Sequence, residues 1–324
     1  MINFWKDKNV FITGGAGFIG TWIIKELVDK GAEVYCLVKE MPKESNFTGL
    51  GLDKKVSLIY GDILDINSLK LFFEKYNIDS VFHLAAQPLV QLALKFPLET
   101  IETNVMGTLN VLEACRLNPR IKRILIASTD KAYGSSEKLP YDETFPLRGE
   151  YPYDVSKSCV DLISHAYGKT YNMPVAITRC SNVYGGGDLN FDRIVPETIK
   201  HILFNENISI RSSGKFKREF FYVKDAAHAY VVLAEKIEEL GLKGEAFNFG
   251  TDKPVVILDL VKNIIDISER KDVKIDILDI AKAEIKDQYL SSEKARKILK
   301  WEPKYNLEEG LKETFNWYKE YFKK

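Results

Sequence analysis

The feature that most constrains the fold is a glycine-rich segment directly after a short apolar run near the start of the chain. The run Asn9–Thr13 has the length and composition of a buried strand, and Thr13–Gly20 then carries glycine at positions 14, 15, 17 and 20. Residues 17–30 continue with apolar side chains at helical spacing. A strand, a glycine turn and a helix in this order predict a βαβ unit with a dinucleotide at the turn.

Three of these glycines have distinct expected roles. Gly14 allows the tight turn, Gly17 lets the backbone approach a pyrophosphate, and Gly20 lets the helix pack closely on the strand. The free N–H groups at the start of the helix would then face the anion. The alternative interpretation of the same segment is a purely structural turn.

The first half of the sequence continues to alternate strand and helix signals. Further strands are predicted at 33–38, 56–60, 80–84, 123–127 and 175–179, with helices at 67–76, 98–116 and 152–171. Strands that alternate with helices of about ten or more residues indicate a parallel sheet. Because the strands are apolar nearly throughout, we expect helices on both faces of this sheet.

A chain of 324 residues is long enough for about two domains. From about residue 185 the pattern changes to helices mixed with short strands, which predicts a smaller α+β lobe. The helices predicted there are 194–204, 224–239, 257–269, 292–299 and 307–322, and the strands are 208–211 and 246–249. We therefore expect an α/β protein with a doubly wound parallel sheet in residues 1–184 and a smaller lobe in 185–324, with small crossings between them.

Composition and charge exclude several classes of protein. Hydrophobic residues make up 45% of the chain and charged residues 28%, which are ordinary values for a globular protein. Lys plus Arg and Asp plus Glu both number 46, so no nucleic-acid partner is expected. No stretch approaches the ~18 apolar residues of a membrane span, and the first eight residues lack the pattern of a signal peptide.

Cysteine and histidine spacing argues against a metal site. The four cysteines, at positions 36, 115, 159 and 180, form no C-x-x-C pair, and the four histidines form no H-E-x-x-H pattern. No metal is therefore expected. Widely spaced free cysteines also favour a reduced, cytoplasmic setting.

The end of the second predicted strand leaves the choice between NAD and NADP open. An acidic residue usually holds the adenosine ribose there, but the expected position carries Val38, followed by Lys39 and Glu40. Glu40 could reach a ribose, whereas Lys39 could hold a 2′-phosphate. Asp62, after the third strand, is expected near the adenine amino group, with a plain Gly-Asp turn as the alternative.

A second chemical signal is the pair Tyr153 and Lys157, whose spacing places both side chains on one helix face. Lys157 is expected to lower the pKa of Tyr153 from its usual value of ~10 toward the working pH. Such a tyrosinate takes a proton from a sugar hydroxyl while hydride leaves its carbon. An exposed helical pair is the alternative, and the preceding glycine loop favours the catalytic interpretation.

With these motifs together, the chain resembles the extended short-chain dehydrogenase/reductase family of nucleotide-sugar enzymes over nearly its whole length. The matching segments are 13–20, 61–62, 83–87, 104–108, 128–134, 153–157, 181–185, 218–225 and 301–303. The resemblance implies an NAD(P)-binding Rossmann domain, a C-terminal lobe for a nucleoside-diphosphate sugar, and reversible oxidation at sugar C4. It also implies a homodimer built from the helices that carry Met106 and Tyr153.

The resemblance further implies a set of cofactor contacts. Besides Gly14, Gly17, Gly20, Lys39, Asp62, Tyr153 and Lys157, these are Phe18, Ile19, Ile63, Leu84, Ala85, Ala86, Asn104 and Cys180.

The segment after the fifth strand distinguishes reactions within the family. Thr129 matches the Ser/Thr partner of the catalytic tyrosine. Simple C4-epimerases usually have small or apolar residues at the next two positions, whereas 4,6-dehydratases have an acid and a base. Asp130 and Lys131 resemble the pair of CDP-glucose 4,6-dehydratases and also that of UDP-N-acetylglucosamine dehydratases. Other motifs favour the CDP-glucose group, although the glycine loop and Val38-Lys39 depart from it.

The dehydratase resemblance assigns chemistry to both residues. Once C4 is a ketone the C5 proton is acidic, so a base removes it while an acid protonates the departing C6 hydroxyl. Asp130 would be the acid, with a raised pKa, and Lys131 the base, with a lowered pKa. The alternative is that Asp130 caps a turn and Lys131 is solvated.

Predicted substrate contacts are Gln87, Thr129, Asn182, Arg193 and Arg218. Gln87 would line the sugar pocket and Asn182 would contact the sugar or its diphosphate. Guanidinium groups suit phosphate oxygens, so the two arginines are candidates for the diphosphate, with surface salt bridges as the alternative. Asp225 is expected to be a structural cap.

Three functions follow from these residues. The first is a lyase that converts an NDP-hexose, with CDP-glucose favoured, to the 4-keto-6-deoxy sugar. The second is a C4-epimerase in which Asp130 and Lys131 are idle. The third is a sensor without catalysis, against which the intact Thr129, Tyr153 and Lys157 set argues.

Overall fold

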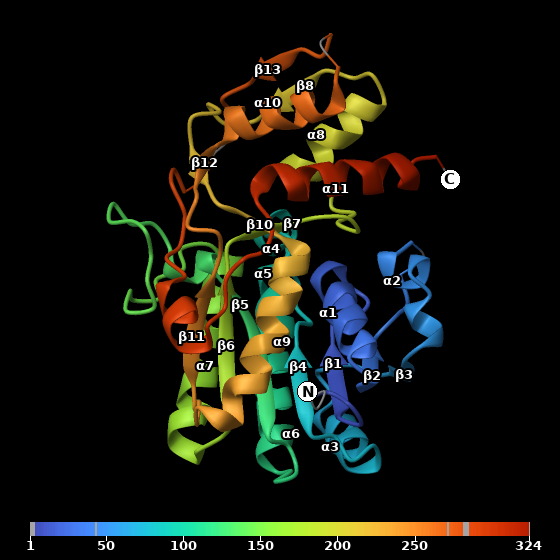
Figure 1. The fold of residues 1–324 in the computed structure, drawn as a ribbon. Helices are drawn as coiled ribbons and strands as arrows, with labels where there is room; N and C mark the ends of the chain where they lie inside the picture. The colour runs from blue at the N-terminus through green and yellow to red at the C-terminus, as the bar shows by residue number, and fades with distance from the viewer. Residues whose placement is uncertain (1–3, 43, 271, 281–284, 324) are drawn as a thin grey trace.

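A seven-stranded parallel sheet forms the centre of the molecule in the computed structural model, which describes residues 4–42, 44–270, 272–280 and 285–323 (Figure 1). Its strand order is β11-β6-β5-β4-β1-β2-β3. The strands are β1 (Asn9–Thr13), β2 (Glu33–Val38), β3 (Ser57–Tyr60), β4 (Ser80–His83), β5 (Arg123–Thr129), β6 (Val175–Cys180) and β11 (Glu245–Phe249). This is the predicted Rossmann-type arrangement, in which strand order reverses beside β1.

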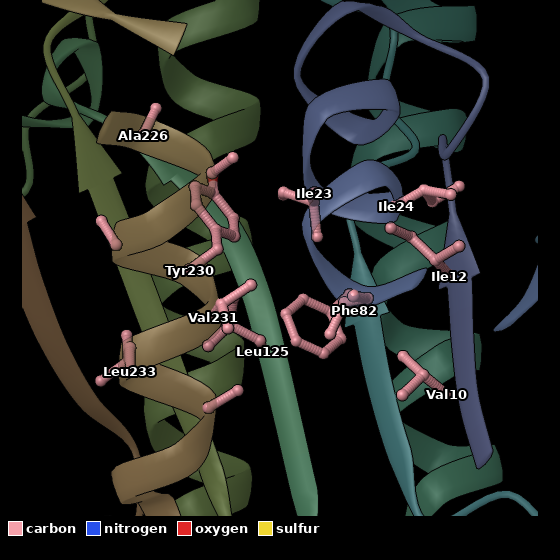
Figure 2. Close-up of a cluster of buried hydrophobic side chains, with 14 of the residues drawn as sticks. Val10, Ile12, Ile23, Ile24, Phe82, Leu125, Ala226, Tyr230, Val231 and Leu233 are labelled. Carbon is pink, nitrogen blue, oxygen red and sulfur yellow. The ribbon is translucent and has the colours of Figure 1, made fainter. Parts of the chain in front are cut away.

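Successive strand residues point to opposite faces of the sheet and are apolar on both faces, so helices cover both. Val10 and Ile12 of β1 join one core with α1 (Phe18–Asp29) and α9 (Val223–Glu239). Phe11 points to the other core, which contains residues of α3 (Ile66–Lys75), α6 (Gly107–Arg116) and α7 (Pro152–Tyr171). Figure 2 shows the first of these cores, with α1 and α9 on the same side of β1, β4 and β5.

A smaller lobe lies above the carboxyl ends of the sheet strands in Figure 1. It contains α8 (Ile194–Leu203), α10 (Ile257–Ser268) and α11 (Leu307–Tyr321), which share a third core. Three two-stranded pairs complete it: β10 (Phe220–Tyr222) with β7 (Asn182–Tyr184), β12 (Val255–Val256) with β9 (Lys217–Arg218), and β13 (Ile275–Ile277) with β8 (Ile208–Ile210). The predicted α+β lobe is therefore present.

Two elements cross from the second half of the chain back to the main sheet. Helix α9 packs against α1, and β11 pairs in parallel with β6 at the edge of the sheet. The predicted division at residue 185 placed both in the smaller lobe. An apolar run shows that a strand is buried, but its partner strand depends on contacts far along the chain.

The predicted helix 98–116 is interrupted in the structure. It consists of α5 (Pro97–Ile101), a π-helical turn at Glu102–Met106 and α6. A second π-helical turn, Ala295–Leu299, occupies most of the predicted helix 292–299. Apolar spacing does not reveal one extra residue in a turn, and such turns are frequent at functional sites.

Among the described residues, no helix combines the length and the apolar composition that are needed to cross a bilayer.

Candidate active site

The loop between β1 and α1 has the close contacts expected of its glycines. Gly14 has φ +70°, and a Cβ there would lie 2.6 Å from the backbone nitrogen of Ala85. A Cβ on Gly20 would lie 2.3 Å from the carbonyl oxygen of Gly14, so only glycine lets α1 approach the loop. Gly17 is the N-cap of α1, and neither a capping side chain nor an acidic residue covers the first turn. This turn therefore suits a pyrophosphate.

The predicted cofactor contacts gather at the carboxyl ends of neighbouring strands, where ligands bind in doubly wound sheets. Phe18 and Ile19 begin α1 after β1, Ile63 follows β3, residues 84–86 follow β4, and Cys180 ends β6. Burial raises the pKa of the Cys180 thiol to about 12, so the thiol is neutral.

His83 is a buried residue that sequence reasoning did not single out. Its two ring nitrogens lie 2.7 Å from the Thr13 hydroxyl and 2.9 Å from the Thr108 hydroxyl. Burial, with a smaller effect of the Lys157 charge, lowers the pKa of His83 to about 3. The neutral ring orients Thr13, whose hydroxyl accepts a hydrogen bond from the backbone N–H of Ala85. His83 thereby helps to hold the segment after β4 against the glycine loop.

Lys39 and Asp62 form one ion pair beside the predicted cofactor site. Lys39 Nζ lies 2.7 Å from Asp62 Oδ2, and Asp62 Oδ1 accepts a hydrogen bond from Leu64 N at 3.0 Å. Burial raises the pKa of Asp62, but Lys39 and the Leu64 N–H outweigh it, and the pKa lies below its usual value. Each of the two residues was expected to contact the cofactor on its own. The ion pair instead makes the position of each side chain depend on the other.

Thr129 and Asp130 end β5 and begin a short 3₁₀ helix at Asp130–Tyr133. Thr129 Oγ1 donates to Asp130 Oδ1 at 3.0 Å and accepts from Lys131 N at 3.4 Å, so Thr129, not Asp130, is the cap. Asp130 is only 1% exposed, and its Oδ2 has no hydrogen-bond partner among the described residues. Buried carboxylate oxygens are usually hydrogen-bonded, so this oxygen calls for an explanation.

Lys131 connects this segment to the start of β7. Its Nζ donates to Asn182 Oδ1 at 3.3 Å and lies 3.8 Å from Asp130 Oδ1. Asn182 is held in turn by hydrogen bonds from its backbone N and its Nδ2 to the carbonyl oxygen of Glu219, at 3.2 and 3.1 Å. The structure thus brings together Asp130, Lys131 and Asn182, and it excludes a fully solvated Lys131.

Tyr153 and Lys157 lie in the first turns of α7, where Pro152 occupies the first helical position. Lys157 is buried, its Nζ donates to the carbonyl oxygen of Ala127 at 2.9 Å, and burial lowers its pKa to about 8. The expectation that Lys157 lowers the pKa of Tyr153 differs from the structure. Burial raises the pKa of Tyr153, and the charge of Arg193 opposes this increase.

Asp154 is a further residue that the sequence did not reveal as part of the site. It is buried, and burial raises its pKa to about 6, while Lys131 lowers and Asp130 raises this value. Its position between Tyr153 and Lys157 was the available signal.

Asn104, in the π-helical turn, ties the segment after β4 to the start of α7. Its Oδ1 accepts from Gln87 N at 2.7 Å, and its Nδ2 donates to Ser156 Oγ at 2.9 Å. The Gln87 side-chain amide makes local hydrogen bonds. Its Nε2 donates to the Leu89 carbonyl oxygen and to Thr100 Oγ1, and its Oε1 accepts from Leu89 N. Gln87 therefore shapes this segment, and its predicted sugar contact gains no support from the geometry.

The two arginines predicted for the diphosphate have protein partners. Arg193 NH1 lies 3.0 Å from Asp188 Oδ2, with its side chain 41% exposed. Arg218 is buried and donates to the carbonyl oxygens of Lys217, Ile285 and Lys286. Their predicted phosphate contacts stay predictions. Asp225 accepts from the backbone N–H groups of 304 and 305 and so fixes a loop, not the start of α9.

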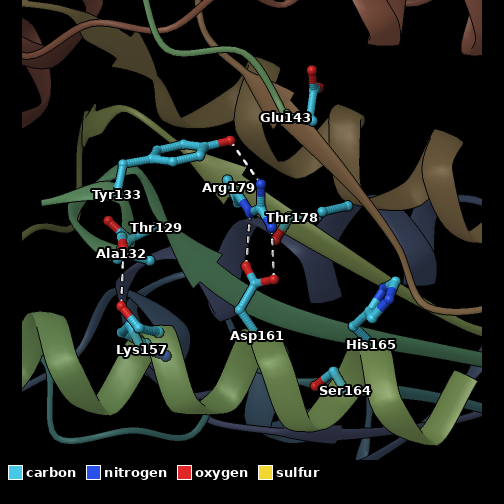
Figure 3. Close-up of polar contacts among 12 residues, drawn as sticks. Thr129, Ala132, Tyr133, Glu143, Lys157, Asp161, Ser164, His165, Thr178 and Arg179 are labelled. Carbon is cyan, nitrogen blue, oxygen red and sulfur yellow. Dashed lines mark hydrogen bonds and ion pairs between the residues drawn. The ribbon is translucent and has the colours of Figure 1, made fainter. Parts of the chain in front are cut away.

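A buried ion pair helps to hold the 3₁₀ helix Asp130–Tyr133 in place (Figure 3). Arg179 of β6 binds both carboxylate oxygens of Asp161 on α7, each at 2.7 Å. Arg179 also donates to the Tyr133 hydroxyl, which donates to Asn248 Oδ1 at 2.8 Å. This network fixes the 3₁₀ helix that carries Asp130 and was not visible in the sequence.

Comparisons with known proteins agree with this geometry. The family model described as GDP-mannose 4,6 dehydratase matches residues 11–314. CDP-glucose 4,6-dehydratase of Salmonella typhimurium is 32% identical, with 98% of this chain and 92% of that protein covered. dTDP-D-glucose 4,6-dehydratase of Bos taurus is 31% identical, with 97% and 90% covered.

Solved structures of both a C4-epimerase and a 4,6-dehydratase share the fold of this chain. The UDP-glucose 4-epimerase of Thermotoga maritima superposes with a TM-score of 0.90 at 27% identity, covering 97% of this chain and 99% of that one. The dTDP-glucose 4,6-dehydratase of Bacillus anthracis, in complex with NAD, gives 0.86 at 27% identity and covers 97% of both chains. The chain therefore belongs to the GDP-mannose 4,6-dehydratase family, among the short-chain dehydrogenase/reductase proteins that its motifs resemble.

Proposed function

We propose that this protein is an NDP-hexose 4,6-dehydratase that uses NAD and takes a CDP-glucose-like substrate. The observation that carries the proposal is the pair Asp130 and Lys131, which stand beside Asn182 at the carboxyl end of β5. A C4-epimerase has no use for an acid and a base at these positions. The relatives named CDP-glucose and dTDP-glucose 4,6-dehydratase support the same reaction.

The residues of the glycine loop fit a dinucleotide. Gly14 and Gly20 allow the close approach of β1, α1 and the segment after β4, and the first turn of α1 faces the expected pyrophosphate. When bound, NAD would supply the acceptor and donor of hydride for the sugar. Solved relatives carry NAD, which supports this choice.

The side chains of this chain account for the proton transfers. Tyr153 takes the proton of the C4 hydroxyl as C4 becomes a ketone. Lys131 then takes the C5 proton while the C6–O bond breaks, and Asp130 donates the proton that releases the oxygen as water. After C6 is reduced, Lys131 returns its proton to C5. Tyr153 still holds the proton of the C4 hydroxyl and Asp130 lacks the one that it gave to water, so the passage of one proton from Tyr153 to Asp130 through solvent restores both groups.

Mass spectrometry tests the proposed function directly. The purified protein would be incubated with CDP-, UDP-, GDP- and dTDP-hexoses, with NAD and NADP in separate reactions. A product lighter by one water is expected, with CDP-glucose the best substrate. An isomer of unchanged mass would indicate the C4-epimerase instead, which is the second candidate because epimerases are also close in structure.

Asp62 offers a test of cofactor choice. In Asp62→Asn, Lys39 loses its carboxylate partner and is expected to favour a 2′-phosphate, so the preference for NADP over NAD rises by about tenfold, as one charge-assisted hydrogen bond of ~1.5 kcal/mol gives. The measurement is kcat/KM with each cofactor. Asp65→Asn is the matched control, because Asp65 lies in the same loop and caps α3. An unchanged NADP-to-NAD ratio in Asp62→Asn would exclude this role of Lys39.

We also assign the first lobe, residues 1–184, to the cofactor, and 185–324 to the nucleotide sugar, with α9 and β11 returning to the sheet.

A homodimer through the helices around Met106 and Tyr153 is supported by exposed apolar side chains on α4 (Val90–Lys95), α5 and α7 and in the π-helical turn. These are Leu92, Leu94, Leu98, Met106, Val155 and Leu162. A solution mass of one chain, measured by light scattering, would contradict it.

A further inference from the structure

Glu219 is a fully buried carboxylate between β9 and β10. Its Oε1 accepts hydrogen bonds from the backbone N–H groups of Thr251 and Asp252 and from the Thr251 hydroxyl, and its Oε2 accepts from Leu290 N at 3.0 Å. One side chain thus joins three segments that are far apart in sequence.

The space around this carboxylate is tight. A Cβ on Gly250 would lie 2.4 Å from Glu219 Oε1, so glycine at 250 is what admits the carboxylate. Burial raises the pKa of Glu219 to about 7, although the N–H groups of Leu290, Asp252 and Thr251 lower it. A group that accepts four hydrogen bonds in so small a space has a fixed position, and so does its own backbone.

The backbone of Glu219 leads directly to the proposed base. Its carbonyl oxygen accepts hydrogen bonds from both the backbone N and the Nδ2 of Asn182. Because Nδ2 is held there, Asn182 Oδ1 faces Lys131 and accepts its Nζ at 3.3 Å. The path from the carboxylate to Lys131 Nζ therefore consists of one residue's backbone and one amide side chain.

We propose that Glu219 is a positioning residue: by anchoring its own backbone to residues 251–252 and 290, it fixes the Asn182 amide that aims Lys131 at the substrate. This inference rests on the proposed function, because the position of Lys131 matters for the reaction only if Lys131 removes the C5 proton. Glu219 acts through Asn182 and does not itself touch the substrate.

Glu219→Gln tests the proposal with little change in volume. The new amide has one acceptor oxygen and one NH₂ group in place of two acceptor oxygens. The NH₂ group would therefore face other donors, either the Leu290 N–H or the N–H groups of Thr251 and Asp252. The shift of the backbone at 219 should misplace Lys131, and kcat should fall by roughly 10²-fold, as a displacement of about 1 Å can cause. KM should change by less than about threefold, because substrate contacts elsewhere persist.

The decisive measurement is the absorbance of reduced nicotinamide during turnover. Tyr153 and Lys157 are unaffected, so C4 oxidation continues while C5 deprotonation slows, and the reduced fraction should rise above that of the unaltered enzyme. A merely structural role would lower the amount of folded enzyme and the melting temperature without changing this fraction. Gly250→Ala moves the carboxylate without removing it, and it should give the same rise.

Glu235→Gln is the matched control. Glu235 of α9 accepts the Trp5 Nε1–H at 2.6 Å and lies 3.7 Å from Lys30 Nζ, and neither of these contacts involves the segments that hold Asn182 or Lys131. It should leave the reduced fraction unchanged. If the unaltered enzyme releases water and Glu219→Gln matches it in kcat and reduced fraction, the positioning role is overturned alone. If the unaltered enzyme releases no water, the proposed function fails, and this role fails with it.

Discussion

Tyr153→Phe is expected to lower kcat by about 10³-fold while binding of NAD survives. Phe keeps the packing of the ring at the start of α7 and removes only the hydroxyl that takes the C4 proton. Positioned acid–base groups usually contribute about 10²- to 10⁴-fold. The loss should affect the dehydratase and the epimerase alike, because both begin with oxidation at C4.

Titration of the variant with NAD, followed by protein fluorescence, separates binding from chemistry. Tyr167→Phe is the control, because Tyr167 lies on the same helix and its hydroxyl donates to the partly exposed Glu113, at 3.3 Å. Undiminished turnover in Tyr153→Phe would refute the mechanism for both reactions. Loss of NAD binding would show instead that the phenol holds the cofactor.

The sheet and its order of elements were predictable because the relevant pattern is local. In β1, Val10 and Ile12 face one helical layer and Phe11 faces the other, so three consecutive apolar residues already indicate a strand covered on both sides. The glycine loop is equally local. The positive φ of Gly14 and the crowding at Gly20 follow from the turn itself.

The site was predictable where chemistry depends on a short motif. Thr129, Asp130 and Lys131 are consecutive, and Tyr153 and Lys157 share a helix face, so each group could be recognised without knowing the fold. The family resemblance assigned Asn182 to the sugar or its diphosphate, and the structure places its Oδ1 beside Lys131. The substrate contact itself stays a prediction.

The rest of the site depends on partners far along the chain. Glu219 is bound by residues 251, 252 and 290, and Arg179 by Asp161 and Tyr133, so neither role has a signature in a short segment. Gln87 was assigned to the sugar from its position in a motif, and its hydrogen bonds to Leu89 and Thr100 had no signal in the sequence. Its sugar contact stays a prediction. The pKa of Tyr153 was expected to fall near Lys157, yet burial, which sequence spacing does not report, raises it.

Lys131→Met is expected to abolish release of water, by about 10²- to 10⁴-fold in kcat, while oxidation at C4 persists. Met keeps the length of the side chain and removes the Nζ that lies 3.3 Å from Asn182 Oδ1 and 3.8 Å from Asp130 Oδ1. Without a base at C5 the ketone cannot lose its C6 hydroxyl, so reduced nicotinamide should accumulate on the enzyme. The measurements are product mass and nicotinamide absorbance on the same sample.

Lys138→Met serves as the control for Lys131→Met, because Lys138 is exposed in the loop that follows the same 3₁₀ helix. The two enzyme hypotheses diverge sharply at position 131. A dehydratase loses its reaction there, whereas an epimerase, which needs only transfer at C4, keeps its turnover with Met at that position. Full activity in Lys131→Met would therefore remove the base from the mechanism and, with it, the argument that connects Glu219 and Asn182 to catalysis. A loss confined to the elimination would assign the C5 base to Lys131, whose partly buried side chain lies 3.8 Å from the buried Asp130.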